Sequence, residues 1–330
     1  MAALGVNNPT LLDMVKSLNP DGSIADLAEL LTLQNDILLD ATVVEGNLTT
    51  GHRSSIRTGI GGATWKKLYG YIAPAKGTQA QVVDSCGMLR RYSEIDADLA
   101  RMSGNVQKFV FNESAAAIEA MNQEMASTLI YGNESLEPEA FTGFAPRYND
   151  QSAENGRNIL TSAATPDATD NTSIWLINWS PQTVFLTFPK GSQAGLKHED
   201  YGEQTATDSN GALLQVYRSL FSWDLGLVVK DWRHVVRINY DLEDITASGS
   251  TGPVLYNLMA QAMRRIPTMS MGRPVFYMNT DSLDAYDLQA MNKSTLAFKS
   301  ITDAQGKVVD TFRGVPVRRV DSILSTEAGI

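Results

Sequence analysis

The chain has 330 residues, of which 43% are hydrophobic and 19% charged, a composition typical of a soluble globular protein with one large domain or two ordinary ones. Its net charge of −10 excludes a surface devoted mainly to nucleic-acid binding, because phosphate affinity needs clustered Lys and Arg. The single cysteine, Cys86, excludes an intrachain disulfide, and we interpret it as a small core residue. Without a membrane-spanning run or a signal-peptide pattern, the sequence predicts no membrane partner and a start in a cytoplasm.

The charged residues are distributed unevenly. Between Gly46 and Val83 there are five basic residues and no Asp or Glu, whereas between Phe109 and Pro146 there are six Glu and no Lys or Arg. A basic island is therefore followed by an acidic one. The basic residues are Arg53, Arg57, Lys66, Lys67 and Lys76, and the acidic ones are Glu113, Glu119, Glu124, Glu134, Glu137 and Glu139.

Two helical patterns occupy the N-terminal segment. Apolar residues at helical spacing run from Leu11 to Leu18 and end at a turn-forming Asn-Pro-Asp-Gly sequence. Ser23 and Asp26 then resemble a capping box that opens a second pattern through Leu38. We interpret both as ordinary amphipathic packing.

From Thr42 to Val83 the pattern becomes extended and rich in glycine, with β-branched and aromatic residues around Trp65 and Tyr69. This predicts a long two-stranded arm. The stretch GIGGATWKKLYGYIAPAKG gives the arm five glycines, which either act as hinges or are simply turn residues. They are Gly59, Gly61, Gly62, Gly70 and Gly77.

The same glycine-rich stretch fails the phosphate-binding templates. In a P-loop the glycines run directly into Gly-Lys-Ser/Thr, but here Ala63, Thr64 and Trp65 separate them from the lysines. A dinucleotide fingerprint from Gly59 would need Gly or Ala where Thr64 stands. Nor do the three histidines have metal or catalytic spacing. The sequence predicts no catalytic site, cofactor or metal.

A long helix is the clearest element of the chain. Asn112 is a suitable N-cap, Glu113 suits a helix N-terminus, and Gly132 suits the position after the last turn. The spacing predicts a helix of about 28 Å over Glu113–Tyr131. Its apolar face contains Ile118, Met121, Met125 and Leu129. A short helix is expected just before it, near Asp96–Met102, with the acids around Asp96 at its start.

The second half of the chain combines strands and helices. Strands are predicted at Ile174–Trp179, Val184–Phe188, Leu225–Val229, Val235–Asn239 and Pro274–Asn279, with a hairpin turn at Asn210-Gly211. Helices are predicted near Pro253–Arg265 and from an Asp281 cap to Leu288, and a last hairpin turns at Gln305-Gly306. Because helices and strands are segregated rather than alternating, the expected class is α+β.

Four segments carry a family resemblance: TWKKLYGYIAPAKGTQAQVVDSCGMLRRYSEIDADLA, NESAAAIEAMNQEMASTLIYGNESLEPEAFTGF, GLVVKDWRHVVRI and FRGVPVRRVDSI. In this order they resemble the major capsid proteins of tailed bacteriophages, most closely those of short-tailed phages. That family has the Hong Kong 97 capsid fold. The resemblance implies an N-terminal arm and helix (1–45), an extended loop (46–83), a peripheral domain with a spine helix (84–148), an axial domain with an inserted β-hairpin (149–310) and a C-terminal return strand (311–330).

The resemblance also implies a structural role rather than an enzymatic one. Copies of the chain would form pentamers and hexamers of an icosahedral shell around double-stranded DNA, bound without sequence recognition. Scaffolding, portal and decoration proteins would be further partners. The chain would reside in the virion, and in the host cytoplasm before assembly. The alternative function is an encapsulin-like bacterial compartment shell, and a hydrolase or nucleotide binder is a more distant competitor. Some family members cross-link neighbouring chains through a loop Lys, but no acceptor Asn or catalytic Glu is matched here, so we do not predict cross-linking.

The two charge islands suggest how neighbouring copies meet. We expect the extended loop of one copy to contact the acidic spine region of the next, with Trp65 and Tyr69 as anchors. Solvated faces, or contact of the basic island with packaged DNA, are the alternatives. The loop residues are Arg53, Arg57, Trp65, Lys66, Lys67, Tyr69 and Lys76, and the spine residues are Glu113, Glu119, Glu124 and Glu134.

Overall fold

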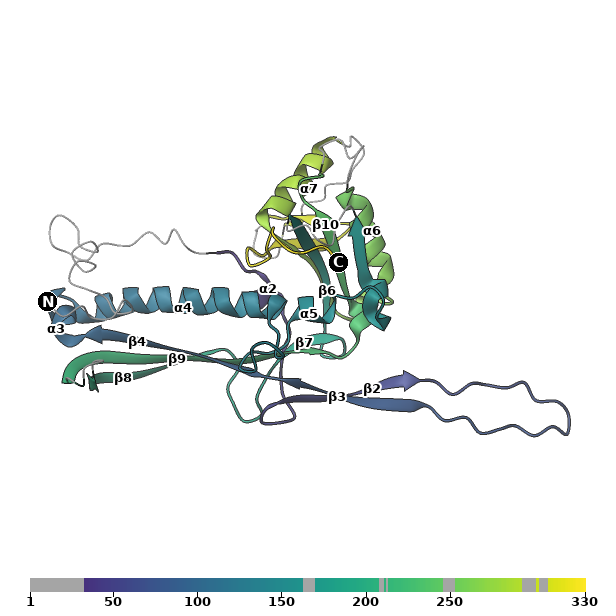
Figure 1. The fold of residues 1–330 in the computed structure, drawn as a ribbon, viewed down its shortest axis with the longest axis horizontal. Helices are drawn as coiled ribbons and strands as arrows, with labels where there is room; N and C mark the ends of the chain where they lie inside the picture. Colours follow the sequence, from purple (N-terminus) through teal and green to yellow (C-terminus); the bar gives the residue numbers. More distant parts are fainter. Residues whose placement is uncertain are drawn as a thin grey trace. The chain divides into compact units, whose positions relative to one another are not determined.

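A computed structural model describes residues 33–162, 170–207, 211, 213–245, 253–292, 301–302 and 308–330 (Figure 1). The helical pattern expected from Leu11 to Leu18 lies outside these residues, as does most of the second one, before the short helix α2 (Ile37–Asp40). The chain forms two compact units. One contains Met88–Ala126 and Gln193–Asp224, and the other contains Gln34–Gly87, Ser127–Ser192 and Leu225–Ile330. We call them the spine unit and the sheet unit.

The spine unit combines a long helix with three strands. Its elements are β4 (Gly87–Asp96), α3 (Ala97–Met102), most of α4 (Val106–Tyr131), β8 (Leu196–Thr207) and the first part of β9 (Leu213–Val229). β9 lies between β4 and β8, and it pairs with β8 from Leu196↔Trp223 to Thr207↔Leu213. Of the turn predicted between them, Asn210 lies outside the described residues, whereas Gly211 has the positive φ of 80° that favours glycine.

The structure corrects the N-terminal end of the long helix. α4 begins at Val106, not Glu113, and the side chain of Asn105 accepts a hydrogen bond from the Lys108 N–H at 3.1 Å. Asn105 is therefore the cap, and Asn112 lies inside the helix. With 26 residues the helix is about 39 Å long. Its end at Tyr131 is as predicted.

The buried face of α4 also differs in one position from the predicted face. Met121, Met125 and Leu129 are buried, but Ile118 is 40% exposed and its neighbour Ala117 is buried instead. Two small cores hold the spine unit together. One is built around Ile95, Leu99, Ala100 and Phe109, and the other around Ala117, Met121 and Phe221. The predicted short helix is confirmed as α3, and the Asp96 carboxylate caps it by accepting the Asp98 and Leu99 N–H groups.

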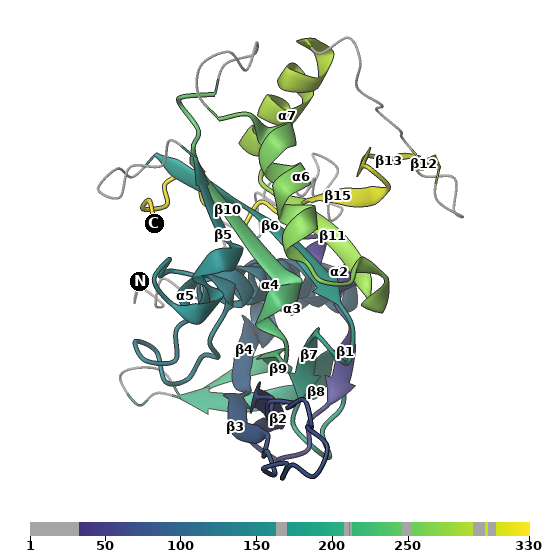
Figure 2. The same ribbon diagram turned by 90° about the vertical axis from the view of Figure 1, so that its right-hand side faces the viewer.

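The sheet unit is built on a mixed sheet covered by two helices. Strand β6 (Asn171–Trp179) is buried along its whole length between β10 (Val235–Asp241) and β11 (Arg273–Met278). The helices α6 (Leu255–Arg265) and α7 (Thr280–Asn292) pack on it through one large apolar core (Figure 2). The remaining strands of this sheet are β1 (Val43–Glu45), β5 (Ile159–Ser162), β7 (Val184–Phe188), β14 (Thr311–Phe312) and β15 (Val315–Arg319), joined by the end of β9.

The predicted strands and helices of this unit are confirmed, with two adjustments. The strand expected at Leu225–Val229 is the last third of the much longer β9. The cap of α7 is Asn279, whose side chain accepts the Ser282 N–H at 2.9 Å, and not Asp281. The last predicted turn, Gln305-Gly306, lies outside the described residues, but the short strands β12 (Ile301–Thr302) and β13 (Val308–Val309) on either side pair antiparallel. The described part of the unit also contains 3-10 turns and the four-residue helix α5 (Phe144–Arg147).

The predicted two-stranded arm is present in the sheet unit. β2 (Gly51–Gly59) and β3 (Thr78–Ser85) pair antiparallel from Gly51↔Ser85 to Gly59↔Thr78, as a sheet of their own. Residues 60–77 join them in a loop that carries no further strand, visible in Figure 1 beyond the arrowhead of β2. We call β2, β3 and this loop the hairpin.

Candidate assembly surfaces

The loop of the hairpin exposes large apolar side chains. Trp65, Leu68 and Tyr69 are 103%, 89% and 101% exposed, so they contact almost nothing in their own chain. Tyr71 and Ile60 are similarly open. Burying one such side chain contributes about 1.5–3 kcal/mol. A cluster of them at one exposed site is a typical feature of a contact surface for another molecule.

The turn at the end of the loop places an unusual residue in a left-handed conformation. The Gly70 N–H donates to the Lys67 carbonyl at 2.9 Å, and Tyr69, at the third position of this turn, has a φ of 60°. That region costs a non-glycine residue about 1–2 kcal/mol. None of the five predicted hinge glycines has a positive φ, so the strained position is Tyr69 itself. Gly59 is instead explained by crowding, because a Cβ there would lie 2.5 Å from Thr78 Oγ1.

The basic residues of the hairpin are all exposed. Lys66 and Lys67 directly follow Trp65 in the loop, Lys76 follows farther along it, and Arg53 and Arg57 lie on β2. Within the described ranges none of the five forms an ion pair. Their positive charges are therefore free to attract an acidic partner.

The predicted acidic residues do not all lie together. Glu113, Glu119 and Glu124 are on the part of α4 that belongs to the spine unit. Glu119 accepts hydrogen bonds from the Leu33 N–H and from Gln123, whereas Glu124 is exposed. Glu134 follows α4, in the sheet unit, where its carboxylate accepts a hydrogen bond from Ser85 at the base of the hairpin.

A groove in the spine unit is lined in part by α4, although Glu113, Glu119 and Glu124 are not among its lining residues. It has a volume of about 500 Å³ and lies between the first half of α4 and the β8–β9 pair. On the helix side it exposes Phe111 (72%) and Ile118, and on the strand side His198 stacks on Phe221 at 4.7 Å. The charged residue in its lining is Asp200. A groove with apolar walls and one acidic residue can bury an aromatic side chain and attract the positive charges next to it.

The base of the hairpin is held by polar contacts. Asp84 on β3 is buried and forms an ion pair with Arg147 of α5 at 2.8 Å. Arg147 also donates to the Thr142 and Leu227 carbonyls. Burial raises the pKa of Asp84, an effect that the positive charge of Arg147 opposes. Burial lowers the pKa of His52, which pairs with Asp84 across the two strands.

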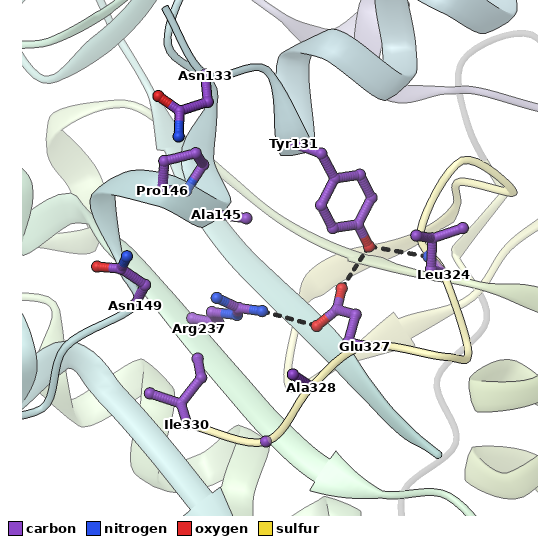
Figure 3. Close-up of a pocket in the computed structure, with 11 residues that line it drawn as sticks. Tyr131, Asn133, Ala145, Pro146, Asn149, Arg237, Leu324, Glu327, Ala328 and Ile330 are labelled. Carbon is purple, nitrogen blue, oxygen red and sulfur yellow. Dashed lines mark hydrogen bonds and ion pairs between the residues drawn. The ribbon is translucent and has the colours of Figure 1, made fainter. Parts of the chain in front are cut away.

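A second buried ion pair anchors the C-terminal segment in the sheet unit (Figure 3). The Glu327 carboxylate accepts hydrogen bonds from Tyr131 and Ser173 and lies 2.7 Å from an Arg237 guanidinium nitrogen. Arg237 also donates to the Tyr148 carbonyl. Burial, reinforced by Glu327, raises the pKa of Tyr131 and keeps it a donor. We call this network the C-terminal anchor.

Sequence reasoning missed both buried ion pairs, although each left a trace. Arg237 stands between Val236 and Ile238 in the strand sequence HVVRINY, and Asp84 follows two valines in QVVDSC. A charge inside an apolar strand must find a partner when it is buried. Its partner is distant in sequence, so the spacing could not identify it. Cys86, which the sequence predicted to be a core residue, is only half-buried and lies just after Asp84 in the chain.

Two further findings concern chemistry and membranes. In the described part of the chain, no three His, Cys, Asp or Glu residues lie close enough together to hold a metal ion. Across the same residues, none of the helices has both the length and the apolar character needed to cross a bilayer.

Comparison with known proteins gives a family match, a strong structural likeness and several remote ones. The family model of major capsid protein GP7 matches residues 19–330. A chain in the structure of bacteriophage Epsilon15 is 31% identical, with a TM-score of 0.80 over 100% of this chain and 99% of that chain. A comparison with curated proteins found no match.

The remote likenesses have low TM-scores. A chain of Microbacterium phage Oxtober96 is 9% identical, with a TM-score of 0.43 over 67% of this chain and 92% of that chain. An encapsulin complex from Synechococcus elongatus contains a chain that is 10% identical, with a TM-score of 0.40 over 66% of this chain and 91% of that chain. At these TM-scores neither likeness indicates a function, and the encapsulin likeness does not favour a compartment shell.

Proposed function

The chain belongs to the major capsid protein GP7 family and has the Hong Kong 97-like capsid fold, and from this we propose that its copies form the pentamers and hexamers of an icosahedral shell around double-stranded DNA. The role is structural and not enzymatic, in keeping with the family. The site of action is the virion, reached from the host cytoplasm after synthesis. Scaffolding, portal and decoration proteins are the proposed additional partners of the shell.

The observation that carries this proposal is the match to a phage capsid structure along the whole chain, at a TM-score of 0.80. Electron microscopy of the purified protein tests it most directly. We expect closed shells, and a protein that stays monomeric under all assembly conditions would refute the proposal.

We further propose a domain organisation for the chain as a shell subunit. The N-terminal arm is 1–45, the extended loop 46–83, the peripheral domain 84–148, the axial domain 149–310 and the return strand 311–330. The extended loop is supported by the β2–β3 pairing, and the peripheral domain by α4. Within 149–310, the β8–β9 pair is the candidate for the inserted hairpin, since it belongs to the spine unit and not to the sheet unit.

The contact between copies is proposed to be made by the hairpin loop. Trp65 and the two lysines that follow it on one copy meet the spine unit of the next, at the groove lined by the first half of α4, the helix that also carries Glu113, Glu119 and Glu124. Three features support this assignment. The loop is fully exposed in its own chain, its cations have no partner within the described residues, and the groove combines apolar walls with an acid. The other hairpin residues of the predicted interface, Arg53, Arg57, Tyr69 and Lys76, add to the same surface. Glu134 contributes less, because it lies in the sheet unit and is hydrogen-bonded to Ser85.

Apolar burial supplies most of the energy of this proposed contact. Exposed ion pairs each contribute about 0–1 kcal/mol, so the charges mainly set register and speed encounter. The aromatic side chains are the anchors, as in most protein interfaces.

A charge-reversal experiment tests the pairing of the two surfaces. Replacing Lys66 and Lys67 with Glu should reduce the yield of shells in sedimentation, because like charges then meet at the contact. Changing Glu119 and Glu124 to Lys in the same chain should restore part of that yield. The control is Lys190→Glu, which changes a charge outside the hairpin. Normal assembly of the Lys66/Lys67 variant would eliminate the proposed pairing, and normal assembly with poor DNA retention would favour the DNA-facing alternative.

A further inference from the structure

The hairpin is attached to the sheet unit almost entirely by polar contacts. The Asn47 side chain makes two hydrogen bonds with the backbone of Arg53, donating to its carbonyl at 2.8 Å and accepting from its N–H at 2.7 Å. Ser85 donates to Glu134 at 2.8 Å, and Asp84 pairs with Arg147. These contacts hold only the start of β2 and the end of β3. Beyond Ser54 on β2 and before Asp84 on β3, every residue of the two strands is exposed or half-exposed.

The base of the hairpin lacks an apolar core of its own. The buried residues of β2 and β3 are Gly51, Ser54 and Asp84, none of which has an apolar side chain. The His52 ring makes a T-shaped contact with Phe185 of β7, with ring centroids 5.3 Å apart. Hydrophobic burial, which dominates the stability of the rest of the unit, contributes little at this point.

Several buried polar atoms at the base have no hydrogen-bond partner within the described chain. They include Ser54 Oγ, the second carboxylate oxygen of Asp84 and His52 Nδ1, together with Thr187 Oγ1 on the adjoining strand β7. Such atoms make the closed arrangement less favourable, because each gave up hydrogen bonds to water without a replacement.

The charge of Asp84 adds to this cost. Burial is the largest influence on the pKa of Asp84 and raises it, and the charge of Arg147, its hydrogen bond and His52 offset only part of that effect. The ionised carboxylate is therefore less favourable in the closed base than in water. Arg147 stabilises the closed base, whereas the charge on Asp84 works against it.

We propose that the base of the hairpin is a weak hinge, in which the buried carboxylate of Asp84 keeps the closed arrangement only marginally favoured so that the arm can change direction. The use of this hinge rests on the proposed function. Rings of five and of six made from one sequence require the same arm to reach its neighbour along different paths. The hinge itself is a property of the single copy, since Asp84, Arg147, His52 and Asn47 all belong to one chain.

Amide hydrogen exchange on the unassembled full-length chain tests the hinge. Exchange is followed in peptides covering residues 45–56 and 80–90, which contain the base. Arg147→Met should speed exchange there by about tenfold or more, because Asp84 is left buried without its charged partner. Asp84→Asn keeps the shape and an acceptor for Arg147 but removes the charge, so exchange should become severalfold slower.

Opposite responses from the two partners of one ion pair distinguish a hinge from an ordinary stabilising contact. If Asp84→Asn speeds exchange as Arg147→Met does, or if neither variant alters it, the proposal is overturned. Arg233→Met is the matched control, because Arg233 pairs with Asp231 at 2.7 Å on the surface of the same unit. It should leave the base unchanged, and the buried strand β6 should be unaffected in every variant. If Arg147→Met does not fold, the direction of the Asp84→Asn change decides alone.

The hinge and the proposed contact between copies can fail separately. The exchange measurement needs no assembly, so it does not depend on where the hairpin loop binds. Trp65→Ala, which removes the loop anchor, should leave exchange at the base unchanged. A hinge without the predicted loop contact would show the opposite responses of Asp84→Asn and Arg147→Met together with normal assembly of Trp65→Ala.

Discussion

The hairpin and the C-terminal anchor use charged and apolar residues in opposite ways. In the anchor, Arg237 and Glu327 are buried and hydrogen-bonded to each other, and Arg237 also donates to Ser173 and to the Tyr148 carbonyl. In the hairpin loop, Trp65 is fully exposed, and the two lysines that follow it have no ion-pair partner in the described chain. The charges of the anchor are thus paired within one copy. The hairpin loop instead exposes apolar and basic residues of the kind that contact another molecule. A shell subunit needs both features, because each copy must fold before its hairpin can bind a neighbouring copy.

The largest effect we expect comes from breaking the anchor. Glu327→Ala leaves the Arg237 guanidinium buried without its carboxylate, and losing one partner of a buried pair costs about 3–5 kcal/mol. Denaturant unfolding of the single chain should show this loss. Glu203→Ala is the control, since Glu203 pairs with Arg101 at an exposed site. It should unfold like the unmodified chain. Equal stability of the Glu327 variant would contradict the idea that the anchor is complete within one copy.

The next effect should appear in assembly and not in folding. Trp65→Ala removes the most exposed aromatic side chain of the hairpin loop and should lower shell yield about tenfold or more, as loss of a central interface residue does. The free energy of unfolding should stay within about 0.5 kcal/mol, because the side chain contacts almost nothing in its own chain. Sedimentation and denaturant unfolding measure the two quantities. Leu136→Ala, which truncates an exposed apolar residue outside the hairpin, is the control.

The smallest effect concerns the pH dependence of the hairpin base. Burial raises the pKa of Asp84 in the closed base, so the closed form binds this proton more tightly than an open form would. Protection of the base should therefore be greatest in acid and should fall as pH rises through that raised pKa. Burial lowers the pKa of His52, which acts in the opposite direction.

The measurement accordingly uses a His52→Gln background, with hydrogen exchange corrected for its intrinsic pH dependence. Glu134 and Lys230, the other charged groups that act on this pair beside Arg147, stay in place. The same chain carrying Asp84→Asn supplies the baseline and should show no such fall. A fall of equal size in both chains would assign the pH dependence to another group.

Local patterns predicted most elements correctly and failed where a distant partner decided the outcome. β7 was predicted residue for residue, because a short apolar run between turn signals has few alternatives. The start of α4 was missed by several residues, since both Asn105 and Asn112 are suitable caps and packing of Phe109 against Ile95 and Leu99 selects the earlier one. Ile118 was assigned to the buried face by its spacing, but the surface it would cover is the open side of the groove.

The candidate surfaces show the same division. The exposed, basic and aromatic character of the hairpin loop follows from its own residues, because nothing else in the chain determines it. The acidic island, in contrast, looked continuous along the sequence, yet Glu134 lies in a different unit from Glu113, Glu119 and Glu124 and bonds the base of the hairpin.

The sequence by itself determined the α+β class, the family, the two-stranded arm and the charge of its loop, because these depend on periodicity, composition and motif order. Only the tertiary structure decided which buried charges meet. Arg237 pairs with Glu327, which is 90 residues away, and Asp84 pairs with Arg147 on the far side of β4, α3 and α4 in the chain. A buried charge must be paired, but pattern cannot say with what, since the choice is made by strands and loops that come together only in the folded protein.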